Sequence, residues 1–561
     1  MSWLFDFRKC GDYHYLYLVQ KKWIPGKGPR NAKQIYIGNA DRLYEKLTQP
    51  PRHLKSFPLG KSAALIHAAQ RTGLWDALQR HLPDRSAQSA WLLLAQILAR
   101  VEKPLSREGM ARWFPESALP LLSPWSSPPS GRALRTTLRD LYDTGEETKE
   151  GAPILTRARV RAIQEDVFRT LRGQGFEPRL VLYDGTNEFV HHRKGRWTRK
   201  GKSKARRYDK NLVGLGMVTV DSIPVISEVF PGNRNDMETF PEVFDALLKR
   251  LEHLEVESER LMLVVDRGVN SVDNFDDILG AMHVVASLKR NEAGELFQVP
   301  REEFRKVGED TKGEPVLGHA GSWEGFDREW RALVTYREAE ALHEARKWDE
   351  TKAKVLPKVA RWRQGRPHKK QKVAMTKLVE LIPERYRGVF DYGVEEVWVK
   401  TAKGKEVLRY RPRCEVVVKK EAELQASFRK TAIITDLEAG KCPDKELLEA
   451  SVARTEIEEQ FRLLKDRYVI SIKPVWVWHD ANVPGHLFLC VMGLMLLRYL
   501  QWEVRDLHLS VKELTERLGK IRVAVVMVEK RPQWVMEEMG IEEAQLAARF
   551  KLLEQLPKAS A

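Results

Sequence analysis

The chain has 561 residues, 43% of them hydrophobic and 31% charged, a balance that is typical of a folded protein and excludes a largely disordered one. The formal net charge is +17, which favours a polyanionic partner such as nucleic acid. The four cysteines lie far apart without Cys-x-x-Cys spacing, so a disulfide framework and a zinc finger are both excluded and a reducing compartment is expected.

The start of the chain, MSWLFDFRKC, has no apolar core long enough for a signal peptide, so we expect a cytoplasmic protein. The longest apolar run, residues 487–497, is closed by His486 and Arg498 and is too short to span a bilayer. We therefore predict a buried core helix there and no membrane partner.

The first 172 residues divide into two regions. Residues 1–60 contain strand-like runs at 13–19 and 34–37 on either side of the turn-rich IPGKGPR, which predicts a small β-rich N-terminal module. Residues 61–172 show apolar residues at helical spacing, as in SAWLLLAQILARV. No helix-turn-helix pattern stands out, so this helical region is a candidate for DNA binding and equally for a packing role.

From residue 173 the pattern changes to α/β. LVLYD (180–184) and LMLVVD (261–266) are short apolar runs typical of buried strands. NLVGLGMVTVD (211–221) and IPVISEVF (223–230) alternate, and the tight turn at Asp221-Ser222 predicts that they pair as a hairpin. HVVASLK (283–289) is expected to be a fifth strand, and helices are expected at about 239–254 and from 271.

The second half interrupts this α/β unit and then completes it. Residues 296–440 hold a long basic helical stretch and strands such as EVWVK and TAIIT, which predicts an insertion. Long helices follow in 441–505. The tail, 506–561, is expected to be helical around one strand.

Two acids end the predicted buried strands of the α/β unit. Asp184 closes LVLYD and Asp266 closes LMLVVD, and the carboxyl ends of strands are where sites form in open α/β sheets. Two such carboxylates on neighbouring strands repel each other unless a cation lies between them, and hard oxygen ligands suit Mg²⁺ or Mn²⁺. The alternative for either acid alone is a helix N-cap that follows a strand.

A third acid comes from the helical segment RTEIEEQFRLLKDRY. At 100° per residue, Glu458 and Lys465 fall within about 40° of Arg454, so the three side chains form one narrow stripe. The stripe adjoins the apolar side chains of Ile457, Phe461 and Leu464. A carboxylate beside two cations suits phosphoryl transfer on DNA, and a surface helix with i,i+4 ion pairs remains the alternative.

A strongly basic segment links the first two strands of the α/β unit. Residues 193–210 hold ten Lys or Arg and one acid. We predict a phosphate-binding loop at the active-site end of the sheet, with a solvated basic loop as the alternative. The residues expected to bind phosphate there are Arg193, Lys194, Arg196, Arg199 and Lys200.

These motifs together resemble one family. LVLYDGT, LVVDRGVNS and Arg454-x3-Glu458-x6-Lys465 are similar to the DDE transposases of bacterial insertion sequences, in the subgroup with a Tyr-x2-Arg-x3-Glu-x6-Lys signature and a β-rich insertion before the Glu. The resemblance covers about 173–505 well and the first 60 residues loosely. Ser451 stands at the usual Tyr position, a departure from the family, in which that Tyr helps to hold DNA phosphate.

The resemblance implies a fold and a metal site. It implies an α/β chain whose RNase H-like catalytic core, 173–295 and 441–505, is interrupted by the insertion domain 296–440. Asp184 would bridge two Mg²⁺ ions, with Mn²⁺ as a substitute, and Asp266 and Glu458 would each hold one. Arg454 and Lys465 would grip the DNA phosphate, and the insertion would contact flanking DNA and the cleaved end.

The resemblance also implies a function. The protein would be a transposase that cuts DNA at terminal inverted repeats and joins the ends to target DNA, as a homodimer associated with the nucleoid. Two alternatives remain open. One is an inactive transposase-derived DNA-binding protein, which Ser451 favours, and the other is an RNase H-like metal-dependent nuclease without strand joining.

Overall fold

The structure is a computed structural model. It describes residues 3–48, 55–125, 127–147, 153–176, 178–191, 195–203, 207–310, 313–473, 475, 477, 482–528 and 531–556. The chain divides into two compact units. One comprises Met1–His67, Glu108–Pro129 and Asp506–Ala561, and the other comprises Ala68–Arg107 and Ser130–Arg505. Each unit therefore combines segments that are distant in the sequence.

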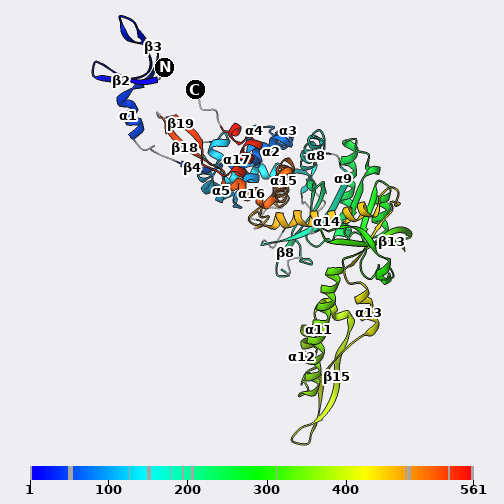
Figure 1. Cartoon of the computed structure of the whole chain (residues 1–561). Coiled ribbons are helices and arrows are strands. Elements are labelled where there is room, and N and C mark those ends of the chain that lie inside the picture. The colour runs from blue at the N-terminus through cyan, green and yellow to red at the C-terminus, as the bar shows by residue number, and fades with distance from the viewer. Residues whose placement is uncertain are drawn as a thin grey trace. The chain divides into compact units, whose positions relative to one another are not determined.

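The first unit begins with a three-stranded antiparallel sheet of β1 (Trp3–Cys10), β2 (Tyr13–Ile24) and β3 (Gly28–Asn39), followed by α1 (Ala40–Thr48) (Figure 1). The strands predicted at 13–19 and 34–37 are confirmed as parts of β2 and β3. Asn39 ends the sheet and starts the helix, because its side-chain oxygen accepts hydrogen bonds from the backbone of Asp41 and Arg42. Several aromatic side chains of this sheet are exposed, including Phe5 and Trp23.

The same unit contains a second sheet, in the order β19-β18-β4. Its strands are β4 (Lys55–Pro58), β18 (Arg522–Val528) and β19 (Arg531–Met536). The tail was expected to hold one strand, and β19 and the pairing with β4 are additions that no local pattern indicates. The shorter helices of this part of the chain are α5 (Arg107–Trp113), α6 (Leu119–Leu122), α16 (Val511–Lys520) and α17 (Ile541–Arg549).

The second unit is built on a nine-stranded mixed sheet, in the order β12-β13-β14-β17-β11-β10-β7-β8-β9. Its strands are β7 (Leu180–Val190), β8 (Asn211–Val220), β9 (Ile223–Pro231), β10 (Met262–Val265), β11 (His283–Ser287), β12 (Arg305–Glu309), β13 (Pro315–Gly325), β14 (Arg328–Tyr336) and β17 (Lys430–Thr435). β7, β10 and β11 run parallel to one another, whereas β8 and β9 are antiparallel to their neighbours.

The β8–β9 hairpin confirms the predicted turn. Asp221 and Ser222 both have positive φ, 46° and 66°. A two-residue turn with two positive φ angles has the twist that joins adjacent antiparallel strands directly. The ladder runs from Val220↔Ile223 to Val213↔Pro231, so β8 and β9 form one edge of the sheet.

The first strand of the α/β unit is longer than predicted. We expected it to end at Asp184, but β7 continues to Val190 because β8 pairs with it along almost its whole length. On its other side, β10 ends at Val265 and pairs with β7 only as far as Leu182. Asp184 therefore lies inside a strand, at the point where the parallel neighbour stops.

Helices cover both faces of this sheet. α9 (Asp236–His253) and α10 (Val272–Leu279) pack on one face, where Tyr183 and Phe240 share the main core. α14 (Asp444–Lys465) crosses the other face. α15 (Asn482–Glu503) packs against β9 and α14. The remaining helices and a short hairpin are α2 (Gly60–Arg71), α3 (Leu74–His81), α4 (Ala87–Glu102), α7 (Gly131–Arg139), α8 (Ala158–Arg172), β5 (Asp143–Glu147) and β6 (Pro153–Thr156).

The apolar run predicted as a core helix lies in α15. Among the described residues, this is the one helix long and apolar enough to cross a membrane, and its apolar window is entirely buried inside the structure. It packs against α4, α7 and β9. The prediction of a buried core helix is therefore confirmed.

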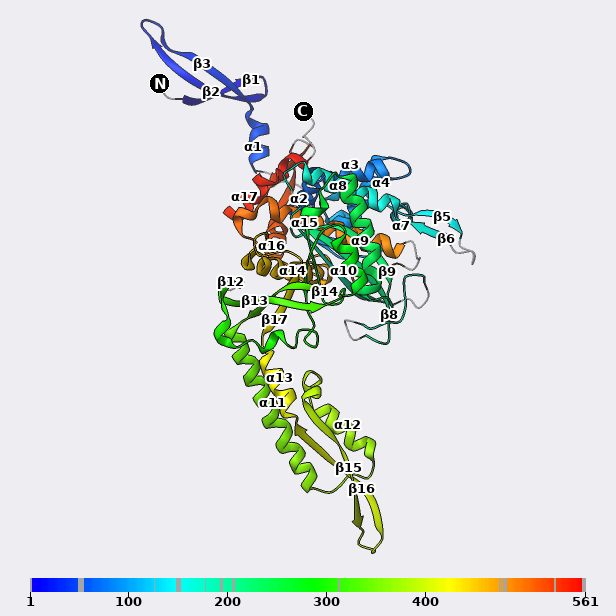
Figure 2. The same cartoon turned by 90° about the vertical axis from the view of Figure 1, so that its right-hand side faces the viewer.

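The segment 296–440, predicted as an insertion, has two parts. β12, β13, β14 and β17 continue the central sheet beyond β11, so these strands are not separate from it. Between β14 and β17 lies an elongated body, which we call the arm (Figure 2). The arm contains α11 (Glu338–Gln364), α12 (Gln371–Leu381), β15 (Phe390–Lys400), β16 (Glu406–Val416) and α13 (Val418–Ala426). It has its own core around Trp348.

Candidate active site

Asp184 and Asp266 stand on neighbouring parallel strands. β7 and β10 pair in the register Leu180↔Met262 to Leu182↔Val264. Continuing that register by two residues places Asp266 opposite Asp184, on the same face of the sheet. Adjacent strands lie about 4.8 Å apart, so this extended register would bring the two residues side by side.

Glu458 is linked to Asp266 through an arginine. Arg454 and Glu458 are one helical turn apart on α14, and Arg454 Nη2 lies 3.3 Å from Glu458 Oε1. The other guanidinium nitrogen, Nη1, forms an ion pair with Asp266 Oδ1. The side chains of Asp266 and Glu458 are 37% and 57% exposed, so both carboxylates face a solvent-accessible space. The predicted stripe of α14 thus meets the sheet at Asp266.

The donor set fits a divalent cation in its chemistry, because it consists of carboxylate oxygens. The guanidinium of Arg454 occupies the position between Asp266 and Glu458 where a metal cation would neutralise the two carboxylates. Among the residues that the structure describes, no three His, Cys, Asp or Glu side chains are close enough to hold a metal as they stand. Asp184 also accepts a hydrogen bond from Gly185 N, at 2.7 Å from Oδ1.

Lys465, predicted to bind phosphate, ends α14 above the same face of β7. Its ammonium lies 2.7 Å from Thr186 Oγ1 and 3.0 Å from Glu188 Oε1. Asp184, Thr186 and Glu188 are alternate residues of β7, so they share one face. Sequence reasoning missed Glu188, although its spacing of four residues from Asp184 was a visible signal.

The basic segment is described only in part. Arg193 and Lys194 lie outside the described residues. Arg196, Arg199 and Lys200 are exposed, and the backbone of Arg199 pairs with Leu212 at the start of β8, which fixes this stretch to the sheet. Lys200 Nζ donates to Tyr208 O at 3.1 Å. Lys200 therefore helps to hold the loop in place, and the side chains of Arg196, Arg199 and Lys200 stay exposed to solvent.

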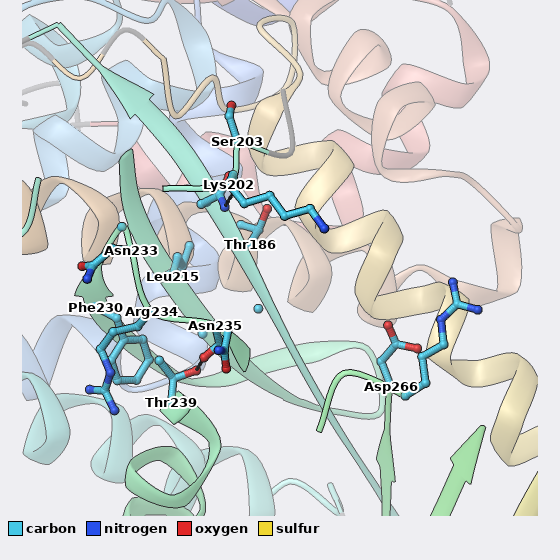
Figure 3. A pocket seen from close by; sticks show the side chains of 16 residues that line it. Thr186, Lys202, Ser203, Leu215, Phe230, Asn233, Arg234, Asn235, Thr239 and Asp266 are labelled. Atoms are coloured by element: carbon cyan, nitrogen blue, oxygen red, sulfur yellow. Dashed lines mark hydrogen bonds between the residues drawn. The ribbon is translucent and has the colours of Figure 1, made fainter. Parts of the chain in front are cut away.

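A cavity of about 530 Å³ adjoins the carboxylate of Asp266. Figure 3 shows Asp266 at one side of it, Arg234 and Asn235 at the other, and Lys202 between them. Asn235 caps α9, since its Oδ1 accepts from Glu238 N at 3.0 Å. Arg267 also lines the cavity, so three cations border it against the one carboxylate of Asp266. Apart from Asp266, sequence reasoning did not single out these cavity residues.

The cavity exists because glycines line the sheet around it. Gly185, Gly214, Gly216 and Gly232 all border it. A Cβ at Gly232 would lie 2.0 Å from Leu212 O, so no other residue fits there without movement of the backbone. Close backbone approach at this position brings the turn after β9 against β8 and shapes that wall.

The tip of the β8–β9 hairpin contacts α14. Gln460 Nε2 donates to Ser222 O at 2.7 Å, and Ser222 Oγ is hydrogen-bonded to Glu456. Burial, and then the charge of Glu456, raises the pKa of Asp221 to about 6. These contacts fix α14 over the sheet, which sets the position of Glu458 relative to the two aspartates.

Comparisons with known proteins add little. No family model and no curated protein matches the chain. Among solved structures, the chain is similar to a protein chain in the cryo-electron-microscopy structure of a piggyBac transposase synaptic complex with hairpin DNA. The identity is 9% and the TM-score is 0.33, and the match covers 84% of this chain and 73% of that chain. At that TM-score the two folds differ in much of their arrangement.

Proposed function

We propose that the protein is a DNA transposase of the DDE class, which cuts DNA at the ends of its element and joins them to target DNA. One observation carries the proposal. Asp184 and Asp266 stand opposite each other on parallel strands, and Arg454 links Asp266 to Glu458 on the helix that crosses the same face. The strand order β9-β8-β7-β10-β11, antiparallel on one side of β7 and parallel on the other, supports an RNase H-like catalytic core.

The three carboxylates would hold two divalent ions, Asp184 contacting both and Asp266 and Glu458 one each. Carboxylate oxygens suit Mg²⁺, and Mn²⁺ can replace it. When bound, such a pair supplies positive charge at both the attacking and the leaving oxygen of an in-line displacement.

The chain's own cations would place the DNA. Arg454 would leave its carboxylate partners and bind a phosphate through its planar fork of donors. Lys465 is held beside Thr186, two residues from Asp184. The exposed Arg196, Arg199 and Lys200, together with Arg193 and Lys194, would bind the backbone next to the cut. Fixed donors of this kind orient the phosphate for attack and stabilise its charge.

The proposal includes the assembly and the location. Joining two ends at once requires two active sites, so we propose a homodimer on paired terminal inverted repeats. We place the protein in the cytoplasm, on the nucleoid.

The test is cleavage of a labelled duplex carrying the inverted repeat that flanks the coding sequence, with and without Mg²⁺. We expect the wild type to cut at the repeat and Glu458→Gln to bind without cutting, with a loss of about 1,000-fold or more in rate. Glu449→Gln is the matched control, because Glu449 is an exposed acid on the same helix whose charge is shared with Lys445. It should cut like the wild type.

The products separate the alternatives. Strand joining to a second duplex supports a transposase, whereas cutting without joining indicates a nuclease. Binding without cutting in either Mg²⁺ or Mn²⁺ would reject the catalytic proposal and leave a DNA-binding protein derived from a transposase.

A further inference from the structure

Glu188 is a buried carboxylate that the proposed chemistry does not use. Its side chain is 2% exposed, and it lies on the same face of β7 as Asp184 and Thr186. A charged carboxylate at such a depth is costly unless cations and hydrogen bonds compensate it. The contacts around Glu188 therefore show what this part of the sheet is built to hold.

Two lysines share the two oxygens of Glu188. Lys465 Nζ lies 3.0 Å from Oε1, and Lys473 Nζ lies 2.5 Å from Oε2. One ammonium would neutralise the carboxylate, so the second leaves the cluster with a net charge of +1. Their side chains are 33% and 31% exposed, so both ammoniums reach solvent although their partner does not.

The backbone that carries Lys473 is anchored on several sides. Ile472 N donates to Leu464 O at 2.8 Å, which ties the segment to the end of α14. His486 Nε2 lies 2.9 Å from Ile472 O, and the buried Arg100 donates to Ser471 O at 3.4 Å. The position of Lys473 is thus fixed by the interior of the unit. A cation held in this way binds an anion with little loss of conformational entropy.

Both ammoniums keep hydrogen-bond donors for a ligand. An ammonium has three donors. Lys465 donates a hydrogen bond to Thr186 and forms an ion pair with Glu188. Lys473 forms an ion pair with Glu188 without a hydrogen bond to its Oε2, and its charge lies 4.3 Å from the centre of the Phe189 ring. The unused donors and the surplus charge are what an anionic oxygen needs.

We propose that Lys473 and Lys465 form a second phosphate site, in which Glu188 is the positioning residue that fixes both ammoniums. The proposal rests on the proposed DNA chemistry of the same sheet face. Four residues of a strand span about 13 Å, so Glu188 lies about that far from Asp184. Lys473, at the Glu188 end of the cluster, therefore binds a phosphate further along the strand being cut than the phosphate that Lys465 helps to place for attack.

The first experiment measures how the affinity for the labelled inverted-repeat duplex depends on salt concentration. Each phosphate contact adds about 0.9 to the slope of log affinity against log salt, so Lys473→Met should reduce the slope by about 0.9. Lys249→Met is the matched control, because Lys249 is an exposed lysine that also pairs with one carboxylate, Asp245. It should leave the slope unchanged. Equal slopes for Lys473→Met and the wild type would overturn the proposal.

The second experiment locates the phosphate. Single phosphates of the duplex are ethylated, and the loss of binding at each position is compared between proteins. We expect Lys473→Met to become insensitive at one position, a few nucleotides from the cut, where the wild type is sensitive. A merely structural lysine would lower the thermal midpoint and leave the interference pattern unchanged, and that result would also overturn the proposal.

Glu188→Gln tests the positioning role. The change removes a negative charge, so affinity for the duplex should hold or rise, while the cleavage rate should fall about tenfold because the ammoniums lose their fixed places. A cleavage rate equal to that of the wild type would overturn the role of Glu188. Failure of the wild type to bind the duplex would instead reject the proposed function.

Discussion

At the scale of single residues, the feature that governs the site is one guanidinium between two carboxylates. Asp266 and Glu458 would repel each other without a cation, and Arg454 supplies that positive charge in the protein alone. A divalent ion would need the same oxygens. In the proposed function, metal binding would therefore compete with the ion pairs of Arg454 and would release the arginine for a phosphate.

We predict that Arg454→Gln binds Mn²⁺ about fivefold more tightly than the wild type, the factor that matches about 1 kcal/mol for a half-exposed ion pair. The same variant should cut DNA more slowly, because the phosphate loses a cation. Calorimetric titration with Mn²⁺ in the absence of DNA measures the affinity. Arg462→Gln, which removes an exposed arginine of the same helix that pairs with Glu459, is the control. An unchanged affinity in Arg454→Gln would mean that the arginine and the metal do not compete.

A second residue, Asp221, links the pH dependence of stability to the hairpin turn. Burial and the neighbouring Glu456 raise the pKa of Asp221 to about 6, above its value of about 3.9 in an unfolded chain. A carboxyl with a raised pKa destabilises the folded state once it ionises. Its cost to stability is absent below about pH 4, grows as the pH rises from about 4 to about 6, and is complete above about pH 6.

Asp221→Asn should therefore raise the thermal midpoint at pH 7 to 8, and the gain should shrink towards zero near pH 4. Asparagine also accepts the positive φ at this turn, so the backbone is not strained by the change. The measurement is a series of melting curves across this pH range for both proteins. A gain that stays constant with pH would show that the charge of Asp221 is not its cause.

At the scale of elements, local sequence patterns predicted which segments form strands and helices. They did not predict features that depend on pairing between distant segments. The hairpin was predictable because Asp221-Ser222 separates two alternating runs. The length of β7 was not, because β8 extends it to Val190. The two aspartates were found from their strands, but the contact of Glu188 with Lys473 depends on a loop far along the chain. No local pattern contains that contact.

The packing of α15 gives an element-scale prediction with a matched pair. A Cβ at Gly485 would lie 2.8 Å from a side-chain carbon of Leu138 on α7 and 3.0 Å from its backbone oxygen. A Cβ at Gly493 would meet its nearest neighbours at 3.5 Å, an ordinary contact. Gly485→Ala should therefore destabilise the protein by about 1 to 3 kcal/mol.

Gly493→Ala should be neutral or stabilise by up to about 1 kcal/mol, since alanine favours a helix more than glycine does. Chemical denaturation of both variants beside the wild type measures the difference. Similar effects of the two changes would contradict the close approach of α15 and α7 at Gly485.

At the scale of the whole molecule, the positive charge is unevenly distributed. Residues 351–379, which run from the second half of α11 through the following loop into α12, hold ten Lys or Arg and no acid. Because β14 and β17 are paired neighbours, with Tyr336 opposite Lys430, the chain enters and leaves the arm at adjacent points of the sheet. The arm is therefore inserted between two paired antiparallel strands, and the sheet is continuous where the arm begins and ends.

The late position of α15 has a consequence for synthesis. This helix covers apolar surfaces of α4, α7 and β9, which leave the ribosome long before residue 482 does. Until it arrives, those surfaces remain open to water and to other chains, which makes the nascent protein prone to aggregation. A frameshift or stop codon upstream of α15 would leave the same surfaces uncovered in the finished product.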